Sequence, residues 1–494
     1  MVQRAIVIGA GISGLAASVR LAAMGMEVTL FDKNRAPGGK MGEIREKGFR
    51  FDTGPSLFTL PELLHELPST GVDQLDARRL KTITRYHFPD GTVFDAPAER
   101  KAFERAVSGQ LGEQTARVRA YLDNAENLYN QTSGLFIFSA FQRYGRLFSA
   151  GNLGVLKALV RSRPHLSMHA YNRRTFSREK CVQIFDRYAT YNGSDPYKAP
   201  STLNMISHLE HNLGAWFPKG GMYRIVEHLE KLALSGGVKT RYGERVEEIL
   251  IQQGMARGVR TTSGKAAADL IVYAGDIRRA YTHLLPGVNP PRSIKNKGLS
   301  SSAMIFYLGY ERAFPELELH NIFFAGDYKE EFRTLSRKGP AILHEDPTVY
   351  IYNSSVLEPG DAPPGGSNLF VMINTPRSRG EDWEALVRKA RGHIFKKLKR
   401  EFRVDLNEGL VLEKMSTPQT IEQQSLSSAG ALYGNHSNSV FSAFNRHPNF
   451  SRRIPNLFFA GGSVHPGGGI PLCLASAKIV EDELTRYLKK KERV

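Results

Sequence analysis

Cysteine is scarce in this chain of 494 residues, which contains only Cys181 and Cys473. Two cysteines so far apart in the sequence cannot build a disulfide framework, and the chain has no CxxC pair of the kind that binds zinc. We expect both to be reduced and buried, as small apolar residues are in a cytoplasmic protein. Long apolar runs are also missing: no 18 consecutive residues are apolar, which argues against a membrane-spanning helix.

A secretory leader is not expected either, because residues 2–8 already have the pattern of a folded β-strand. Hydrophobic residues make up 41% of the chain and charged residues 23%, which is ordinary for a globular protein and argues against disorder. The length predicts two or three domains with substantial cores.

Positive charge is in excess, with a formal net charge of +18. Nucleic acid, an anionic membrane surface, or solubility alone would each explain such a charge. The chain has no nucleic-acid recognition motif, so binding of nucleic acid is not predicted.

Acidic residues are absent from residues 127–178, where basic side chains alternate with apolar and aromatic ones. Glycine and proline interrupt the segment too often for one long helix. We predict a helical region that docks on the cytoplasmic face of an anionic inner membrane. The alternative is a helical domain with an apolar core and solvated arginines. The basic residues of the segment are Arg143, Arg146, Lys157, Arg161, Arg163, Arg173, Arg174 and Arg178.

The clearest motif is a glycine-rich turn between a short apolar strand at residues 5–8 and a helical pattern that ends near Gly25. In such a turn, Gly9 permits the sharp bend, Gly11 lets the backbone approach a pyrophosphate, and Gly14 lets the helix pack on the strand. The pyrophosphate would meet free N–H groups at the helix N-terminus, including those of Ile12 and Ser13.

A second strand at residues 27–31 ends at Asp32, 18 residues after Gly14, where a carboxylate can accept a hydrogen bond from a ribose hydroxyl. Lys33 follows it and is a further candidate for cofactor binding. A GxGxxG motif with both flanking elements and a terminal acid is a strong dinucleotide signal, and the competing interpretation is a chance cluster of glycines in a loop.

The next segment, residues 35–41, resembles the PGGR-type extension of the large flavoprotein oxidoreductase and amine-oxidase superfamily. The resemblance implies that FAD is the cofactor and that Gly38 and Gly39 wrap its pyrophosphate. Lys40 stands where arginine is usual, so a point charge replaces a bidentate fork. The turn that follows it in the superfamily, which approaches the flavin, corresponds here to Gly54, Pro55 and Ser56.

A second glycine-rich turn, residues 461–471, lies between an apolar strand at 456–460 and a helix expected over 472–489. It resembles the GxxTHPGxGxP signature of the phytoene-desaturase-type carotenoid desaturases, in which this turn contacts the flavin ring and ribityl chain. A positive helix end there would stabilise negative charge on reduced flavin. The residues that the resemblance assigns to the cofactor are Gly462, Ser463, Gly469, Ile470 and Pro471.

Residues 238–276 predict short strands with turns at Gln253-Gly254 and Ser263-Gly264, a meander that returns to the main sheet. The superfamily resemblance places Val246 beside the adenine. Later strands are expected at 348–354, 368–374 and 410–413, and a basic amphipathic helix at 382–402.

The predicted fold is α/β, α+β overall, with a discontinuous Rossmann-type FAD domain, a mixed-sheet substrate domain and a helical, membrane-associating domain. Its expected boundaries are 1–65, 222–280 and 452–494 for the FAD-binding domain, 66–190 for the helical region, and 191–221 and 281–451 for the substrate-binding domain.

Residues 214–222 resemble the G(T/A)WYPxGGM segment that borders the substrate cavity of the carotenoid desaturases. Trp216 and Phe217 could therefore line an apolar tunnel, although plain core packing would equally explain either. His208 and Glu210 are candidates for a polar partner deep in the tunnel, and with His211 they lack the spacing of a metal site. His465 is a further tunnel candidate, for which a structural role in its turn is the favoured alternative.

The family resemblance covers most of the chain and implies a flavoenzyme that desaturates a long polyene lipid, with quinone or oxygen as electron acceptor. Residues 51–59, 191–193 and 320–324 look most like the hydroxycarotenoid 3,4-desaturases of marine Bacteroidetes, which act on 1-hydroxylated acyclic ends. The resemblance leaves three alternatives: a multistep phytoene desaturase, an FAD amine oxidase, and a flavin-free lipid carrier. No catalytic residue is predicted, because hydride transfer from an allylic carbon needs an apolar tunnel and alignment more than an acid–base pair.

Overall fold

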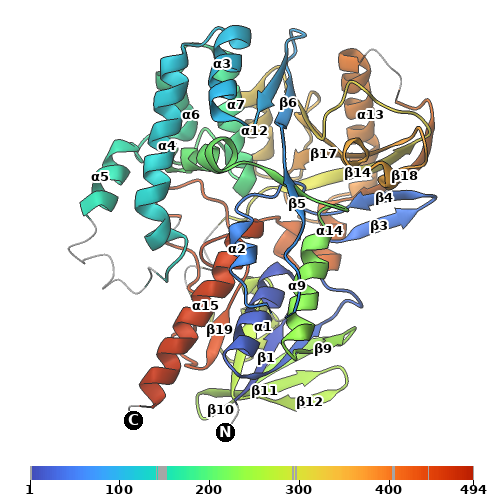
Figure 1. The fold of residues 1–494 in the computed structure, drawn as a ribbon. Coiled ribbons are helices and arrows are strands. Elements are labelled where there is room, and N and C mark those ends of the chain that lie inside the picture. The colour runs from blue at the N-terminus through green and yellow to red at the C-terminus, as the bar shows by residue number, and fades with distance from the viewer. Residues whose placement is uncertain are drawn as a thin grey trace.

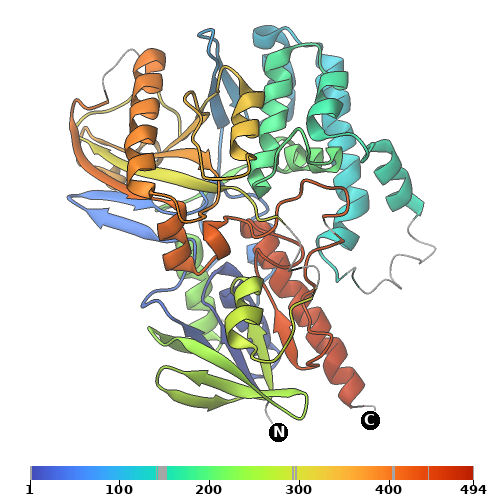
Figure 2. The ribbon, with the colours of Figure 1, turned by 180° about the vertical axis from the view of Figure 1, so that it is seen from behind.

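The structure is a computed structural model of the chain, and it describes residues 3–69, 71–140, 142, 153–291, 294, 298–402, 406–442 and 444–492. A parallel sheet lies at one end of the molecule and a larger, mostly antiparallel sheet at the other, with a group of helices beside the larger sheet (Figure 1, Figure 2). Among the described residues, no helix combines the length and apolarity that crossing a membrane requires.

The parallel sheet has the strand order β19-β13-β1-β2-β9, and it gathers three separated pieces of the chain. This confirms the prediction of a discontinuous Rossmann-type sheet. Side chains of β1 alternate, so that Ala5 and Val7 face one core while Ile6 and Ile8 face another. The strands are β1 (Arg4–Ile8), β2 (Glu27–Asp32), β9 (Lys239–Tyr242), β13 (Leu270–Tyr273) and β19 (Leu457–Phe459).

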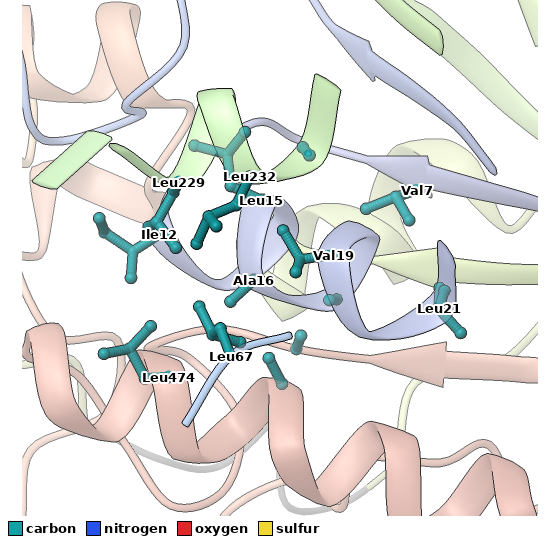
Figure 3. Packing of buried hydrophobic residues seen from close by; sticks show 14 of the residues in the cluster. Val7, Ile12, Leu15, Ala16, Val19, Leu21, Leu67, Leu229, Leu232 and Leu474 are labelled. Atoms are coloured by element: carbon teal, nitrogen blue, oxygen red, sulfur yellow. The ribbon is translucent and has the colours of Figure 1, made fainter. Parts of the chain in front are cut away.

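Three helices cover the first face of this sheet: α1 (Ile12–Ala23), α9 (Arg224–Ser235) and α15 (Ile470–Lys491). Leu15 of α1 packs with Leu229 of α9 and Leu474 of α15 (Figure 3). The small side chains of α1 allow this close approach. The buried Arg20 of α1 adds an ion pair of 2.6 Å with Glu481 of α15.

The predicted meander covers the opposite face as a three-stranded antiparallel sheet of β10 (Val246–Gln252), β11 (Met255–Thr261) and β12 (Gly264–Ala267). Its first turn has positive φ at both Gln253 and Gly254, as a tight hairpin turn requires. The chain then returns to the parallel sheet at β13, as the sequence predicts.

The larger sheet has seven strands in the order β18-β14-β17-β16-β15-β6-β7, and its neighbours are antiparallel except β15 and β6. α13 (Trp383–Phe402) packs on one face. The predicted strands at 348–354, 368–374 and 410–413 belong to this sheet. Its members are β6 (Thr82–His87), β7 (Val93–Pro97), β14 (Ser302–Tyr310), β15 (His320–Phe323), β16 (Val349–Asn353), β17 (Ser367–Thr375) and β18 (Leu410–Ser416).

The boundary drawn for the helical region, 66–190, was wrong at its start. Residues 77–97 form three strands, of which β6 and β7 complete the larger sheet and β5 (Ala77–Arg79) pairs with β8 (Trp216–Pro218). In β6 the polar Thr84 is buried like Ile83 and Tyr86, so the strand lacks the simple apolar–polar alternation that predicts a strand. The helices that follow are α3 (Arg100–Leu111), α4 (Thr115–Phe136), α5 (Leu153–Arg161), α6 (Met168–Thr175) and α7 (Glu179–Asp186).

Smaller elements connect these parts. A hairpin of β3 (Glu43–Glu46) and β4 (Phe49–Asp52) follows the parallel sheet. The remaining longer elements are α2 (Glu62–His65), α12 (Tyr328–Leu335) and α14 (Pro418–Ser425).

A buried ion pair at the end of β4 joins the two sheets. Asp52 accepts hydrogen bonds from the backbone N–H groups of Met222 and Tyr223, both at 3.0 Å, and from the Tyr352 hydroxyl of β16 at 3.0 Å. Arg50 donates to the same carboxylate at 2.6 Å. Both side chains are at least 95% buried, so the pair is shielded from water and salt.

Arg50 extends the junction to three further segments. It lies 3.2 Å from Asp361 and 2.9 Å from Glu43, and its carbonyl accepts from Asn368 of β17 at 2.6 Å. The start of α9, β16 and β17 are therefore held against β4 at one point.

We expect Asp52→Ala to lower the free energy of unfolding by about 3–5 kcal/mol, because it leaves a buried guanidinium short of a partner. Chemical denaturation measures this loss. Glu330→Gln is the matched control: it removes an exposed pair with Arg333, 48% and 64% exposed, and should change stability by less than about 1 kcal/mol. Equal effects of the two substitutions would contradict the stabilising role of the Arg50–Asp52 pair between the two sheets.

Candidate functional site

One cavity of about 1550 Å³ extends between the two sheets and reaches the inner side of α4. It is larger than the 300–1,000 Å³ of ordinary small-molecule pockets, so it has room for a large cofactor together with a second ligand. All the predicted cofactor residues except Gly14 line it: Gly9, Gly11, Ile12, Ser13, Asp32, Lys33, Gly38, Gly39, Lys40, Gly54, Pro55, Ser56, Val246, Gly462, Ser463, Gly469, Ile470 and Pro471.

The backbone of the first glycine turn requires glycine at two of its three positions, Gly9 and Gly14. Gly9 has a φ of 104°, which favours glycine, and its N–H donates to the carbonyl of Phe31 at 2.7 Å. A Cβ on Gly14 would lie 1.7 Å from the Gly9 carbonyl oxygen, so Gly14 is needed for packing. Gly11 differs: its φ of −74° suits any residue, and a Cβ there would have no atom closer than 3.9 Å.

Asp32, at the end of β2, is held by the turn. One carboxylate oxygen accepts from the backbone N–H of Ala10 at 2.7 Å and the other from that of Asn34 at 2.8 Å. A carboxylate has about four acceptor sites, so both oxygens retain capacity toward the cavity. Lys33 instead points its ammonium at Gln424, donating to the carbonyl at 2.6 Å.

The second turn lies against the first, with the N–H of Gly38 donating to the Ala10 carbonyl at 2.8 Å. Lys40 was expected to meet phosphate, yet its ammonium donates to the carbonyls of Ala431 and Leu432 at 2.8 and 2.6 Å. Burial lowers the pKa of Lys40 to about 8. These bonds tie the cofactor side of the cavity to the loop before the last strand, and they leave one of its three N–H groups for a ligand.

The closing turn brings a second helix end to the same cavity. Gly467 and Gly469 have φ of 141° and 111°, values that favour glycine, and α15 starts directly after Gly469. Ser463 fixes the turn to the end of β13: its Oγ accepts from the N–H of Ile277 at 2.9 Å and lies 3.3 Å from the Gly275 carbonyl.

Neither helix end has a side-chain cap. Both α1 and α15 lack a capping hydrogen bond and an acidic residue in the first turn, so their positive N-termini face the cavity without an internal counter-charge. Two such helix ends, together with a carboxylate that can accept a hydrogen bond from a ribose hydroxyl, fit a dinucleotide with an anionic pyrophosphate and a second electron-poor ring system.

The substrate-tunnel predictions are mostly wrong, because His208, Trp216, Phe217 and His465 do not line the cavity. Phe217 is fully buried in a separate apolar core, and Trp216 packs against the core of the parallel sheet. His208 is turned toward Asn212, 2.7 Å from its amide nitrogen. Glu210 does line the cavity.

His465 holds its turn instead, which is the structural role named as its alternative. Its Nε2 lies 3.0 Å from the carbonyl of Ser139, and its own carbonyl accepts from the Asn449 amide at 2.8 Å. Burial lowers the pKa of His465 to about 3, so the ring is neutral near pH 7.

A group of polar side chains lies in the cavity wall, and sequence reasoning named only Glu210 among them as a site candidate. We call the group the polar patch: Arg187, Tyr191, Glu210, His320 and Tyr350. Tyr191 and His320 lie in segments that show a family resemblance but no chemical motif, and Arg187 lies in no motif. Their signal is tertiary, because the four segments that carry these residues, spread over 164 positions, meet only in the folded chain.

We expect Gly11→Val to reduce cofactor binding and Gly14→Ala to reduce thermal stability. Gly11→Val should fold with near-normal thermal stability and retain much less dinucleotide, because its side chain occupies cavity space. Gly14→Ala should lower the melting temperature, because its Cβ collides with the Gly9 carbonyl. Thermal melts and the cofactor-to-protein ratio of the purified proteins separate the two. A Gly11→Val protein with full cofactor content would contradict the assigned site.

Comparisons with known proteins agree with this geometry. The family model of flavin-containing amine oxidoreductases matches residues 12–480. The 1-hydroxycarotenoid 3,4-desaturase of Flavobacterium sp. (strain P99-3) is 43% identical, over 97% of this chain and 98% of that protein. The 4,4'-diapolycopene oxygenase of a Methylomonas species is 32% identical, over 99% of each chain.

Among solved structures, wild-type putrescine oxidase bound to putrescine has the same fold, with a TM-score of 0.63 over 98% of this chain and 99% of that one. At 12% identity that likeness concerns the fold alone. The chain belongs to the flavin-containing amine oxidoreductase family, in the branch that contains the carotenoid desaturases, and is an FAD-dependent oxidoreductase.

Proposed function

We propose that this enzyme desaturates an acyclic carotenoid, and that its reaction is the 3,4-desaturation of a 1-hydroxycarotenoid. The observation that carries the proposal is the 43% identity, over nearly the whole of both chains, to a protein with that activity. The cavity supports it, because it combines a predominantly apolar wall with one polar patch.

When bound, FAD would supply a two-electron acceptor for the hydride of an allylic carbon. The walls of the cavity exclude water and align the polyene, with apolar side chains such as Leu128, Phe136 and Ile206. The adjacent carbon would lose a proton to solvent, which leaves a new carbon–carbon double bond, and the final electron acceptor would take up two electrons and two protons. Quinone or oxygen is the proposed final electron acceptor.

Residues of the two glycine turns would hold the cofactor. The free N–H groups at the start of α1 would bind the pyrophosphate, Asp32 the ribose, and Val246 the adenine side. The start of α15, at Gly469 and Ile470, offers positive potential to the flavin, which favours acceptance of negative charge.

Product analysis tests this function. The holoprotein, purified with FAD, is incubated separately with a 1-hydroxylated acyclic carotenoid and with phytoene, and the absorption spectra of the products are recorded. We expect one added double bond in the hydroxylated substrate. Conversion of phytoene alone would instead make the enzyme a multistep phytoene desaturase.

We also propose that α5 docks on an anionic membrane at the cytoplasmic face, from which the polyene enters. Leu156 and Val160, four residues apart on the same face, are 60% and 69% exposed. Lys157 and Arg161 belong to the same helix, which projects from the edge of the molecule (Figure 1). Leu159 of this helix lines the cavity, which brings the cavity to the docking face. Arg143 and Arg146 of the predicted basic segment lie outside the described residues.

The double variant Leu156→Ser and Val160→Ser should weaken binding to anionic phospholipid vesicles at least tenfold, because two apolar side chains no longer enter the lipid. Cosedimentation measures the bound fraction. Leu234→Ser is the matched control, since Leu234 is 51% exposed on α9, in the cofactor part of the molecule. Unchanged sedimentation of the double variant would contradict docking through α5.

A further inference from the structure

Glu210 places a carboxylate in the wall of a predominantly apolar cavity. It belongs to a short π-helical turn, Leu209–Leu213, and its side chain is fully buried. A buried carboxylate is costly unless hydrogen bonds and an opposite charge compensate it.

Two tyrosines and one arginine provide that compensation. Tyr188 donates to one oxygen of Glu210 at 2.8 Å, and Tyr191 donates to the other. The guanidinium of Arg187 lies 3.7 Å from the first oxygen. Arg187, Tyr191 and Glu210 line the cavity, whereas Tyr188 stands behind them.

Arg187 is held in an aromatic cage. Its guanidinium carbon lies 4.9–5.4 Å from the ring centroids of Tyr86, Tyr188 and Tyr191, and it donates to the Tyr86 hydroxyl at 2.9 Å. Its Nε has no hydrogen-bond partner among the described residues. The cage fixes the position of the cation against the cavity.

The polar patch continues to the turn assigned to the flavin side. The hydroxyl of Tyr350 lies 2.6 Å from the Oγ of Ser56 and 2.7 Å from Nδ1 of His320. Burial, together with the smaller effect of the Arg187 charge, lowers the pKa of His320 to about 3. The patch therefore stands beside the predicted reaction centre.

A purely hydrocarbon polyene gains nothing from such a patch, because it can neither donate nor accept a hydrogen bond. An alcohol can do both: its O–H donates to a carboxylate, and its lone pairs accept from a guanidinium or a phenol. We propose that the polar patch is the binding site for the hydroxyl group of an alcohol-terminated polyene, with a carboxylate oxygen of Glu210 accepting a hydrogen bond from the O–H group and the guanidinium of Arg187 donating to the hydroxyl oxygen.

The proposal rests on the proposed function and explains its regiochemistry. In a 1-hydroxylated chain, the oxygen-bearing carbon is separated from the 3,4-bond by one carbon atom. An anchor for that hydroxyl must then lie close to the hydride acceptor. The contact between Tyr350 of the patch and Ser56, in the turn assigned to the flavin side, places the patch close to the hydride acceptor.

The test compares two polyenes that differ only in the terminal hydroxyl, using the FAD-loaded enzyme. The measured quantity is the selectivity, defined as kcat/KM for the hydroxylated polyene divided by kcat/KM for its deoxy analogue. We expect the wild type to favour the hydroxylated polyene, because the deoxy analogue leaves buried polar groups unpaired. Glu210→Gln keeps the shape of the side chain and should lower the selectivity about tenfold, as expected for loss of a charged hydrogen bond.

A double variant, Arg187→Met with Glu210→Met, removes both charges together and avoids an uncompensated ion. Its selectivity should fall to about one. Tyr197→Phe is the matched control, because Tyr197 is a neighbouring tyrosine that does not line the cavity, and its selectivity should equal that of the wild type. Thermal melts and flavin content verify that each variant is folded.

The outcomes separate this proposal from the function on which it rests. A wild type that converts neither polyene overturns the proposed function. A wild type that converts both equally overturns the hydroxyl site and leaves carotenoid desaturation standing. A selective wild type whose selectivity persists in folded Glu210→Gln also overturns the site, even if the double variant does not fold.

Discussion

The buried pair of Arg50 and Asp52 is the contact on which the arrangement of the molecule depends. The cofactor sheet and the larger sheet have separate cores, so their apolar packing alone does not set one against the other. Asp52 binds the start of α9 on one side and Tyr352 of β16 on the other, at a point with little water. A buried carboxylate tolerates few geometries, so the pair fixes the distance between the two sheets. The cavity occupies the space between them.

Within the cavity, charge is distributed unevenly. The uncapped ends of α1 and α15 and the carboxylate of Asp32 occupy the cofactor side, where they suit a polar, anionic group. The side toward α4 is mostly apolar and suits a lipid. Between them lies the polar patch around Glu210, in which a cation and an anion balance one another inside a ring of tyrosines. The proposed desaturation needs all three environments, the cofactor side, the apolar side and the polar patch, next to one another in one cavity.

Local patterns predicted the cofactor side well, since each glycine turn is a short segment whose backbone requirements appear directly in its residues. Gly14 must be glycine because its own strand–turn–helix unit leaves no room for a Cβ. Local patterns failed for Trp216 and Phe217, because an apolar residue in a strand is compatible with a tunnel wall and with a core alike. They also missed β6 and β7, because β6 pairs with β15, more than 200 positions away, and β7 pairs with β6.

By itself, the sequence determined the dinucleotide unit, the discontinuous sheet and the family, because these depend on short motifs and their spacing. Tertiary structure alone decided which residues form the polar patch. Arg187, Glu210, His320 and Tyr350 come from separate segments, and no local pattern of residues records that they meet. Packing of the larger sheet against the helices brings them together. The ion pair at the end of β4 holds that sheet in place against the cofactor-binding part of the molecule.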